Sequence, residues 1–283
     1  MRVAQRALRI EPFHVMEVAK AARALDRPTG HDRPPMLYLN IGEPDFTAAP
    51  LVVQAGERAL REGRTQYLPA LGLESLRERL SQWYLDRFGL SVPARRIVIT
   101  AGASAALQLA CLALIEAGDE VLMPDPSYPC NRQFVQAAQG QAVLLPCEAA
   151  QRYQLSAAQV REHWGANTRG VLLASPSNPT GTSMAASELR EIHQVVSQHG
   201  GITMVDEIYL GLSFDAAYGQ SALALGEDII SINSFSKYFN MTGWRLGWLV
   251  VPEALVDVME RLTQNLYICA SAIAQHAALA CFE

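Results

Sequence analysis

From about residue 95 onward, short runs of β-branched and aliphatic residues alternate with longer segments of helical pattern. This alternation is typical of a mostly parallel sheet, because strands joined by helical segments return to the sheet in the same direction. We therefore predict an α/β fold whose mostly parallel, seven-stranded sheet is sandwiched by helices. One connecting helix should begin at a cap on Ser187 and end at Gly200. The predicted strands span residues 96–100, 120–124, 142–146, 170–174, 202–206, 229–233 and 246–251.

The first 45 residues follow a different pattern. They contain one amphipathic helical segment, then the Pro-rich break HDRPPM, then the run LYLNIGEPDF, which we interpret as extended. We predict an arm and linker over residues 1–45 and one large domain over residues 46–283. The C-terminal stretch is helical by pattern and stops without a polar tail or a turn.

Composition excludes several classes of protein. A chain of 283 residues with 50% hydrophobic residues can bury a large core, so disorder is not its main state. The formal charge of -5 is spread without blocks of like charge, which argues against a nucleic-acid partner. The start lacks the apolar core of a signal peptide, and there is no run of eighteen apolar residues, so we expect a soluble, cytoplasmic protein without membrane contact. Five scattered cysteines without a CxxC pair indicate reduced thiols and no metal site.

Polar residues follow several of the predicted strands, and in open α/β sheets ligands bind at these carboxyl ends. After strand 96–100 comes the small-residue turn AGAS, which leads into a helix. Backbone N–H groups at Gly102, Ala103 and Ser104 could face a phosphate at the positive end of the helix dipole, although tight packing alone also favours small residues there.

The next two sites are an amide and a carboxylate. Strand 170–174 is followed by SPSNPTGT, where Asn178 projects its side chain at a turn. Strand 202–206 ends in Asp206, and Tyr209 lies three residues later. A carboxylate at the end of a strongly apolar strand is costly unless a cation or a strong donor meets it, so Asp206 implies a partner. A plain turn and a helix cap are the alternatives.

A lysine follows the sixth predicted strand, in the segment SFSKYFNMTGWRLGW. Lys237 lies in a Ser-rich loop, and Arg245 follows eight positions later. Aromatic and Ser neighbours could desolvate the amine and lower its pKa, which lysines that form Schiff bases require. A solvated loop lysine is the alternative.

These features, in this order, resemble the fold-type I pyridoxal-phosphate enzymes, and specifically the class I/II aminotransferases. The resemblance rests on SPSNPTGT, VDEIY and SFSKYFNMTGWRLGW, joined upstream by YLNIGEPDF and TQYLPALG, and it covers nearly the whole chain. It implies a transferase of amino-acid metabolism that moves an amino group between an amino acid and a 2-oxo acid. It also implies a homodimer.

The resemblance implies a role for each residue of the cofactor ring site. Lys237 would form the internal aldimine, a Schiff base with pyridoxal 5'-phosphate, and then move protons between substrate and cofactor carbons. Asp206 would pair with the pyridine nitrogen and keep it protonated. Tyr209 and Asn178 would donate to the phenolic oxygen and tune the pKa of the imine. Tyr128 would stack on the face of the ring.

For the phosphate, the resemblance implies the backbone of the AGAS turn, the hydroxyls of Ser234 and Ser236, and the guanidinium of Arg245. Ser234, three positions before the lysine, is the better hydroxyl ligand of the two. Tyr67 would reach the phosphate from a second subunit. Gly42 and Asn178 would contact the substrate.

The pattern departs from the family at the C-terminal end. Family members continue into a segment that completes a small domain and carries an arginine for the substrate α-carboxylate, whereas this sequence stops at Glu283. We expect a truncated chain with an incomplete small domain.

Two other functions remain open. One is a β-eliminating lyase of the C–S lyase type, which uses the same electron sink. The other is a non-catalytic sensor that binds the cofactor, which is disfavoured because no helix-turn-helix segment is visible.

Overall fold

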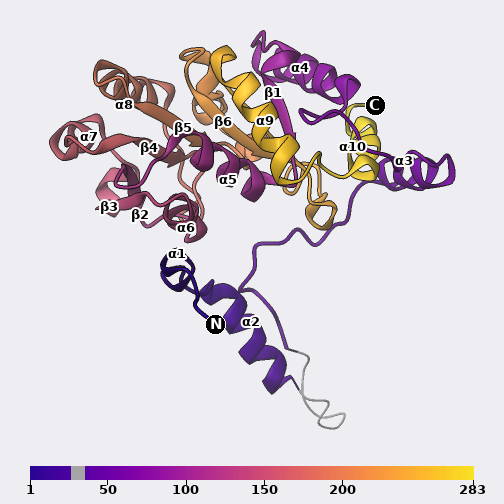
Figure 1. The fold of residues 1–283 in the computed structure, drawn as a ribbon, viewed down its shortest axis with the longest axis horizontal. Helices are drawn as coiled ribbons and strands as arrows, with labels where there is room; N and C mark the ends of the chain where they lie inside the picture. The colour runs from indigo at the N-terminus through magenta and orange to yellow at the C-terminus, as the bar shows by residue number, and fades with distance from the viewer. Residues whose placement is uncertain (27–35) are drawn as a thin grey trace.

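A seven-stranded sheet organises the protein in the computed structural model, which describes residues 1–26 and 36–283 (Figure 1). The strand order is β1-β7-β6-β5-β4-β2-β3. Each predicted strand overlaps an observed one, so the predicted α/β fold is confirmed. The strands are β1 (Ile97–Thr100), β2 (Glu120–Asp125), β3 (Gln141–Pro146), β4 (Thr168–Ala174), β5 (Ile202–Asp206), β6 (Ile230–Ser234) and β7 (Gly247–Val250).

Only β7 departs from the parallel arrangement, because it runs antiparallel to both of its neighbours, β1 and β6. The connection from β6 to β7, residues 235–246, contains only the single-turn 3₁₀ helix Thr242–Trp244. It therefore provides no crossover helix, and the chain reverses beside the strand it has just left. As a result, the end of β6 and the start of β7 lie at the same edge of the sheet.

Helices cover both faces of the sheet, as predicted. α5, α6 and α9 pack on one face, while α3, α4, α7, α8 and α10 pack on the other. Because side chains alternate along a strand, Val98 of β1 faces the first group and Ile97 and Ile99 face the second. The helices are α3 (Pro50–Arg61), α4 (Glu74–Phe88), α5 (Ala103–Leu114), α6 (Cys130–Ala137), α7 (Ala157–His163), α8 (Ala186–Gln198), α9 (Val256–Leu266) and α10 (Ala272–Ala278).

The N-terminal segment contains two helices, α1 (Gln5–Leu8) and α2 (His14–Leu25), so the prediction of a single helix is wrong. Pro12 lies between them and disfavours helical geometry in the residue before it. α2 extends away from the body (Figure 1), and Glu11 N–H donates to Gln133 Oε1 of α6 at 3.3 Å. Most of the Pro-rich break, residues 31–35, lies outside the described residues. The run 37–46 forms no strand, and it bends where Glu43 N–H donates to Ile41 O at 2.9 Å.

The predicted cap of α8 is also wrong by two positions. The N-cap is Ala185 rather than Ser187, and Glu188 Oε2 accepts the N–H of Ala185 at 2.7 Å. This is the N3 half of a capping box, in which a carboxylate of the first turn accepts the N–H of the N-cap residue. The helix ends at Gln198, and Gly200 follows with φ +67°, the left-handed conformation expected at a helix stop.

No helix within residues 1–26 or 36–283 is long and apolar enough to cross a membrane. In the same ranges, no three His, Cys, Asp or Glu side chains are grouped so that they could hold a metal ion.

The first strand residue after the reversal, Gly247, permits a close approach between β7 and the turn before α5. A Cβ atom at residue 247 would lie 2.7 Å from Ala103 N and 2.8 Å from Asn233 O, and these backbone atoms cannot rotate away. We expect Gly247→Ala to destabilise the protein by about 1–3 kcal/mol, the usual effect of overpacking. Gly243→Ala is the control, since nothing lies within 4 Å of a Cβ there. Urea unfolding midpoints of the two variants provide the measurement, and equal midpoints would contradict the prediction.

Candidate active site

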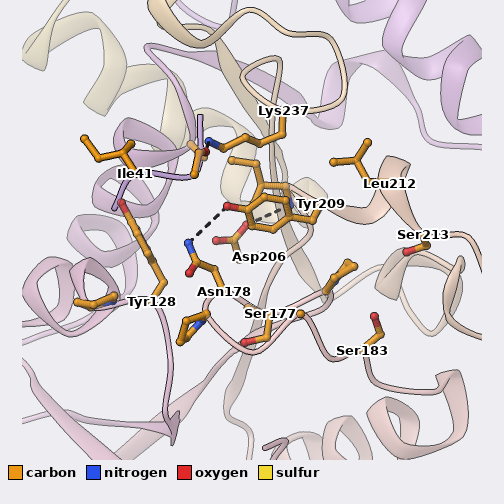
Figure 2. A pocket seen from close by; sticks show the side chains of 18 of the residues that line it. Ile41, Tyr128, Ser177, Asn178, Ser183, Asp206, Tyr209, Leu212, Ser213 and Lys237 are labelled. Atoms are coloured by element: carbon orange, nitrogen blue, oxygen red, sulfur yellow. Dashed lines mark hydrogen bonds between the residues drawn. The ribbon is translucent and has the colours of Figure 1, made fainter. Parts of the chain in front are cut away.

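A cavity of about 840 Å³ opens at the carboxyl ends of β4 and β5 (Figure 2). This is where a ligand is expected in an open α/β sheet. Its walls come from segments that are distant in sequence: the start of α5, the turn at 128–129, the loop after β4, the end of β5, the loop after β6 and the N-terminal segment. The predicted site residues that line it are Gly42, Ala103, Ser104, Tyr128, Asn178, Asp206, Tyr209 and Lys237.

Asp206 ends β5 and is 6% exposed. One carboxylate oxygen, Oδ1, accepts the N–H of Ile208 at 3.1 Å. Burial raises the pKa of this carboxyl to about 6, and the single backbone hydrogen bond opposes the rise only in part. Within the described ranges, no Lys, Arg or His forms an ion pair with Asp206. The ionised carboxylate thus lacks the cation that its burial calls for.

Asn178 and Tyr209 lie together beside Asp206 (Figure 2). Asn178 Nδ2 donates to the hydroxyl oxygen of Tyr209 at 3.4 Å. Burial raises the pKa of Tyr209 above its ordinary value, so the phenol keeps its proton at neutral pH. The pair therefore offers an O–H and an N–H donor on the same wall of the cavity.

Lys237 is half-buried in the loop after β6, and its Nζ donates to the backbone carbonyl of Gly42 at 2.5 Å. Burial lowers the pKa of Lys237, the charge of Arg245 lowers it further, and the charge of Glu43 opposes both. A larger fraction of the amine is therefore unprotonated at neutral pH than for a solvated lysine. This is the property that a nucleophilic lysine requires.

Arg245 lies against the turn that precedes α5. Gly102 is the N-cap of α5 with φ +87°, and a Cβ there would lie 2.5 Å from Arg245 Nη2, so only glycine permits this approach. Arg245 itself adopts φ +52°, and its Nη1 donates to Thr242 O at 2.8 Å. A guanidinium beside the positive end of a twelve-residue helix creates a site suited to an anion such as a phosphate.

The two predicted hydroxyl ligands differ in their contacts. Ser234 is 1% exposed, and its hydroxyl donates to Leu246 O at 3.2 Å and accepts Ser236 N–H at 3.0 Å. In the described part of the chain, the hydroxyl of Ser236 has no hydrogen-bond partner. The preference for Ser234 over Ser236 stays a prediction, and these contacts leave Ser236 as the freer donor.

The other two predicted tyrosines, Tyr128 and Tyr67, lie in different environments. Tyr128 lines the cavity, where burial raises its pKa, and it meets the ring of Phe13 edge to face at a centroid distance of 5.9 Å. Tyr67 is 80% exposed and does not line the cavity of its own chain. The structure thus brings Tyr128 to the site and leaves Tyr67 on the surface.

Comparison with known proteins identifies the family. The sequence model of the family described as aminotransferase class I and II matches residues 34–283. The chain belongs to this family. Because the match spans most of the chain and the relatives below carry aminotransferase names, the protein is an aminotransferase of fold type I, a transferase that acts on amino and oxo acids.

Two curated relatives and two solved structures illustrate the similarity. Valine–pyruvate aminotransferase of Mycobacterium tuberculosis is 38% identical over 282 residues, covering 99% of this chain and 71% of the relative. The (5-formylfuran-3-yl)methyl phosphate transaminase of Methanocaldococcus jannaschii is 33% identical, with coverage of 99% and 72%. The structure of an aminotransferase from M. tuberculosis superposes with a TM-score of 0.93 at 38% identity, covering 100% of this chain and 72% of that one. The aspartate aminotransferase of Rhizobium meliloti gives 0.92 at 28% identity, with coverage of 100% and 71%.

Sequence reasoning missed several residues of this aminotransferase that line the cavity or support it. Ile208 lines the cavity between Asp206 and Tyr209, and its place inside the DEIY motif could have revealed it. Phe13 and Val15 of the N-terminal segment also line the cavity. No local signal marks them, because their position depends on how the arm returns to the body.

The raised pKa of Asp206 predicts how stability depends on pH. The folded-state pKa of about 6 exceeds the ordinary value of 3.8, so the unpaired charge destabilises the fold above the folded pKa and has no effect below 3.8. We expect Asp206→Asn to stabilise the cofactor-free protein at higher pH by up to about 3 kcal/mol, and this gain to vanish at low pH. Asp86→Asn, on the exposed face of α4, is the control. Urea unfolding above and below both pKa values is the measurement. A gain from Asp206→Asn that is equal at both pH values would refute the assignment.

Proposed function

We propose that this aminotransferase uses pyridoxal 5'-phosphate attached to Lys237, and that it moves the amino group of an amino acid to a 2-oxo acid. The observation that carries the proposal is the pairing, within one cavity, of a buried carboxylate without a cation, Asp206, and a lysine with a lowered pKa, Lys237. A cofactor with a cationic ring nitrogen and an aldehyde would satisfy both groups.

The donor set fits this cofactor at each of its polar groups. Asp206 would hold the ring nitrogen, and Tyr209 with Asn178 would hold the phenolic oxygen. The start of α5 with Arg245 would hold the phosphate, aided by Ser236 or Ser234. Tyr128 would cover one face of the ring.

When bound, pyridoxal phosphate supplies an electron sink for the charge that develops at the substrate α-carbon. The Asp206 carboxylate is ionised above its pKa of about 6, so it can hold a proton on a facing nitrogen through a charge-assisted hydrogen bond. The Tyr209 hydroxyl keeps its proton and can donate a hydrogen bond to a facing oxygen. The unprotonated Nζ of Lys237 can take a proton from the α-carbon and return it to another carbon within its reach.

Substrate contacts are proposed at Gly42 and Asn178, which lie on two walls of the cavity. Among the cavity-lining residues of the described ranges there is no arginine. Of the two Asn178 N–H groups, one donates to Tyr209, and the other is the donor that we assign to the space shared by the phenolic oxygen and a substrate carboxylate. We also propose that residues 46–283 are the large cofactor-binding domain and that residues 1–45 are an arm and linker.

A homodimer and a cytoplasmic location complete the proposal. The exposure of Tyr67, together with its absence from the cavity lining of its own chain, supports a role at the site of a second copy. All five cysteines are free, which fits a reducing compartment.

The sequence leaves two other functions open. β-Elimination could use the same residues, and a sensor would bind the cofactor without turnover. The names of the relatives, all aminotransferases or transaminases among those reported above, favour transamination.

The proposed function is tested through the two lysines of the chain, Lys20 and Lys237. We expect borohydride to fix pyridoxal phosphate on Lys237 of the wild-type chain, and added amino acids to bleach its visible absorbance as an oxo acid forms. Lys237→Ala should lose the reducible link and turnover, because no amine remains in the cavity. Lys20→Ala is the control, since that side chain is 80% exposed on α2. A reducible link that persists in Lys237→Ala, located by mass spectrometry, would sink the assignment.

The dimer proposal is tested by mixing two defective chains. If Tyr67 acts across the interface, a mixed dimer of Lys237→Ala and Tyr67→Phe chains has one site with both defects and one with neither. We expect it to recover about half the activity of the wild-type dimer, because one of two symmetric sites is intact. Activity no higher than the sum of the two parent homodimers would place Tyr67 at its own chain's site or away from the phosphate.

A further inference from the structure

A short segment of the N-terminal linker, residues 40–44 and here called the strap, lies across the loop that carries Lys237. At one end, Asn40 Nδ2 donates to Val15 O of α2 at 3.1 Å. In the middle, Gly42 O accepts from Lys237 Nζ. Glu43 Oε1 then accepts from the hydroxyl of Thr242 at 2.9 Å. The strap is thus tied to the arm at one end and to the lysine loop at the other.

Hydrogen bonds rather than burial hold the strap in place. Ile41, Gly42 and Glu43 are all exposed, so the strap contributes few apolar contacts. Segments with little buried surface open at low free-energy cost. The two contacts with the lysine loop therefore decide whether the strap stays closed.

Thr242 connects the strap to the anion site. Its hydroxyl donates to Glu43, while its carbonyl accepts Arg245 Nη1 at 2.8 Å. Arg245 has φ +52°, a conformation that a residue with a Cβ adopts only when its surroundings support it. One residue thus orients both the strap and the guanidinium beside Gly102.

The strap contributes residues to two cavities. Gly42 and Lys237 line the 840 Å³ cavity of the site, whereas Glu43 and Thr242 line a second cavity of about 680 Å³ together with Trp244. The hydrogen bond between Glu43 and Thr242 thus lies at the second cavity, one residue along the strap from the contact with Lys237.

We propose that Glu43 is a positioning residue, and that its hydrogen bond with Thr242 is the latch that keeps the strap closed over the lysine loop once the cofactor is attached. This inference rests on the proposed function. A Schiff base at Lys237 would use up N–H groups of the amine, so the hydrogen bond from Nζ to Gly42 O would be lost. The Glu43–Thr242 latch then alone keeps the strap on the lysine loop.

The latch also places a negative charge near Lys237. Glu43 raises the pKa of Lys237, while burial and Arg245 lower it. The other titratable groups that line the cavity are Asp206 and Tyr209 at the end of β5, Tyr128, and Asp215 and Tyr218 in the segment after β5. If Glu43 loses its charge or its position, the pKa of Lys237 should fall, and its amine should become reactive at lower pH. A merely structural role for Glu43 would not produce this change.

The experiment uses the whole chain loaded with pyridoxal phosphate and two measurements. The first is the rate of cofactor release after dilution, and the second is the pH midpoint of the rate at which free cofactor attaches. Thr242→Val removes the hydroxyl and keeps the carbonyl that holds Arg245. We expect it to speed release about tenfold, the effect of losing one hydrogen bond to a charged group, and to lower the pH midpoint. Thr242→Ser keeps a hydroxyl, so its release rate and its pH midpoint should return to those of the wild type.

Glu43→Gln separates the two effects, because it keeps an acceptor oxygen and removes the charge. We expect release to change less than in Thr242→Val, and the pH midpoint to fall. Asp45→Asn is the matched control, because it removes an exposed carboxylate two residues along the chain. Its release rate and midpoint should equal those of the wild type.

The outcomes separate the latch from the proposed function. If the wild-type chain forms no reducible link, the proposed function fails. If it does, and Thr242→Val and Glu43→Gln both match Asp45→Asn in release and midpoint, the latch is refuted. Should Thr242→Val fail to fold, Glu43→Gln decides: a pH midpoint below that of Asp45→Asn supports the latch, and a midpoint equal to it overturns the latch.

Discussion

The reversal of the chain between β6 and β7 is the constraint on which the site depends. A parallel β7 would need a crossover helix, which would carry Arg245 to the opposite edge of the sheet. The antiparallel return keeps Lys237 and Arg245 in a single loop, beside the start of α5. It also requires close packing, because Gly247 lies against the backbone of the Gly102 turn and Arg245 against Gly102 itself. A nucleophile and an anion site are thereby fixed to one rigid frame.

Burial then acts in opposite directions on the two ionisable groups of the cavity. It raises the pKa of Asp206 and lowers that of Lys237, because it disfavours the charged form of each. Without a ligand, the cavity holds a carboxylate that resists ionisation and an amine that resists protonation. Each of the two side chains makes one hydrogen bond to the rest of the protein, and a ligand with a cationic nitrogen and an electrophilic carbon would relieve both.

Much of this arrangement was predictable from the sequence, for identifiable reasons. The strands appear as continuous apolar runs because both faces of the sheet are covered, and strand ends locate Asn178, Asp206 and Lys237 because parallel strands end at one edge. The N-terminal segment was less predictable. Pro12 splits a helix that periodicity alone joins, and the strap contacts of Gly42 and Glu43 depend on tertiary placement rather than on local pattern. The predicted cap at Ser187 is wrong because α8 begins at Ala186, where Glu188 accepts the N–H of the N-cap residue Ala185 without any serine cap.

The neighbouring carboxylates Asp206 and Glu207 show how burial alone fails to identify a functional group. Glu207 is 2% exposed, and burial raises its pKa to about 7. Its oxygens nevertheless accept three hydrogen bonds, from Ser221 Oγ at 2.9 Å, Ala222 N at 2.6 Å and Ser231 Oγ at 2.5 Å. These contacts join the end of β5 to β6 and to the segment between them, so Glu207 is satisfied within the fold.

Asp206 is as deeply buried, yet it accepts one backbone N–H and faces the cavity. The two carboxylates differ in how many hydrogen bonds they accept from the protein, not in how deeply they are buried. A structural carboxylate is one whose acceptor capacity the fold itself fills, and a ligand-binding carboxylate is one whose remaining capacity is directed into an open space. By that criterion the two neighbouring carboxylates at the end of β5 have different roles. Glu207 holds the edge of the sheet in shape, and that shape fixes the direction in which Asp206 presents its charge.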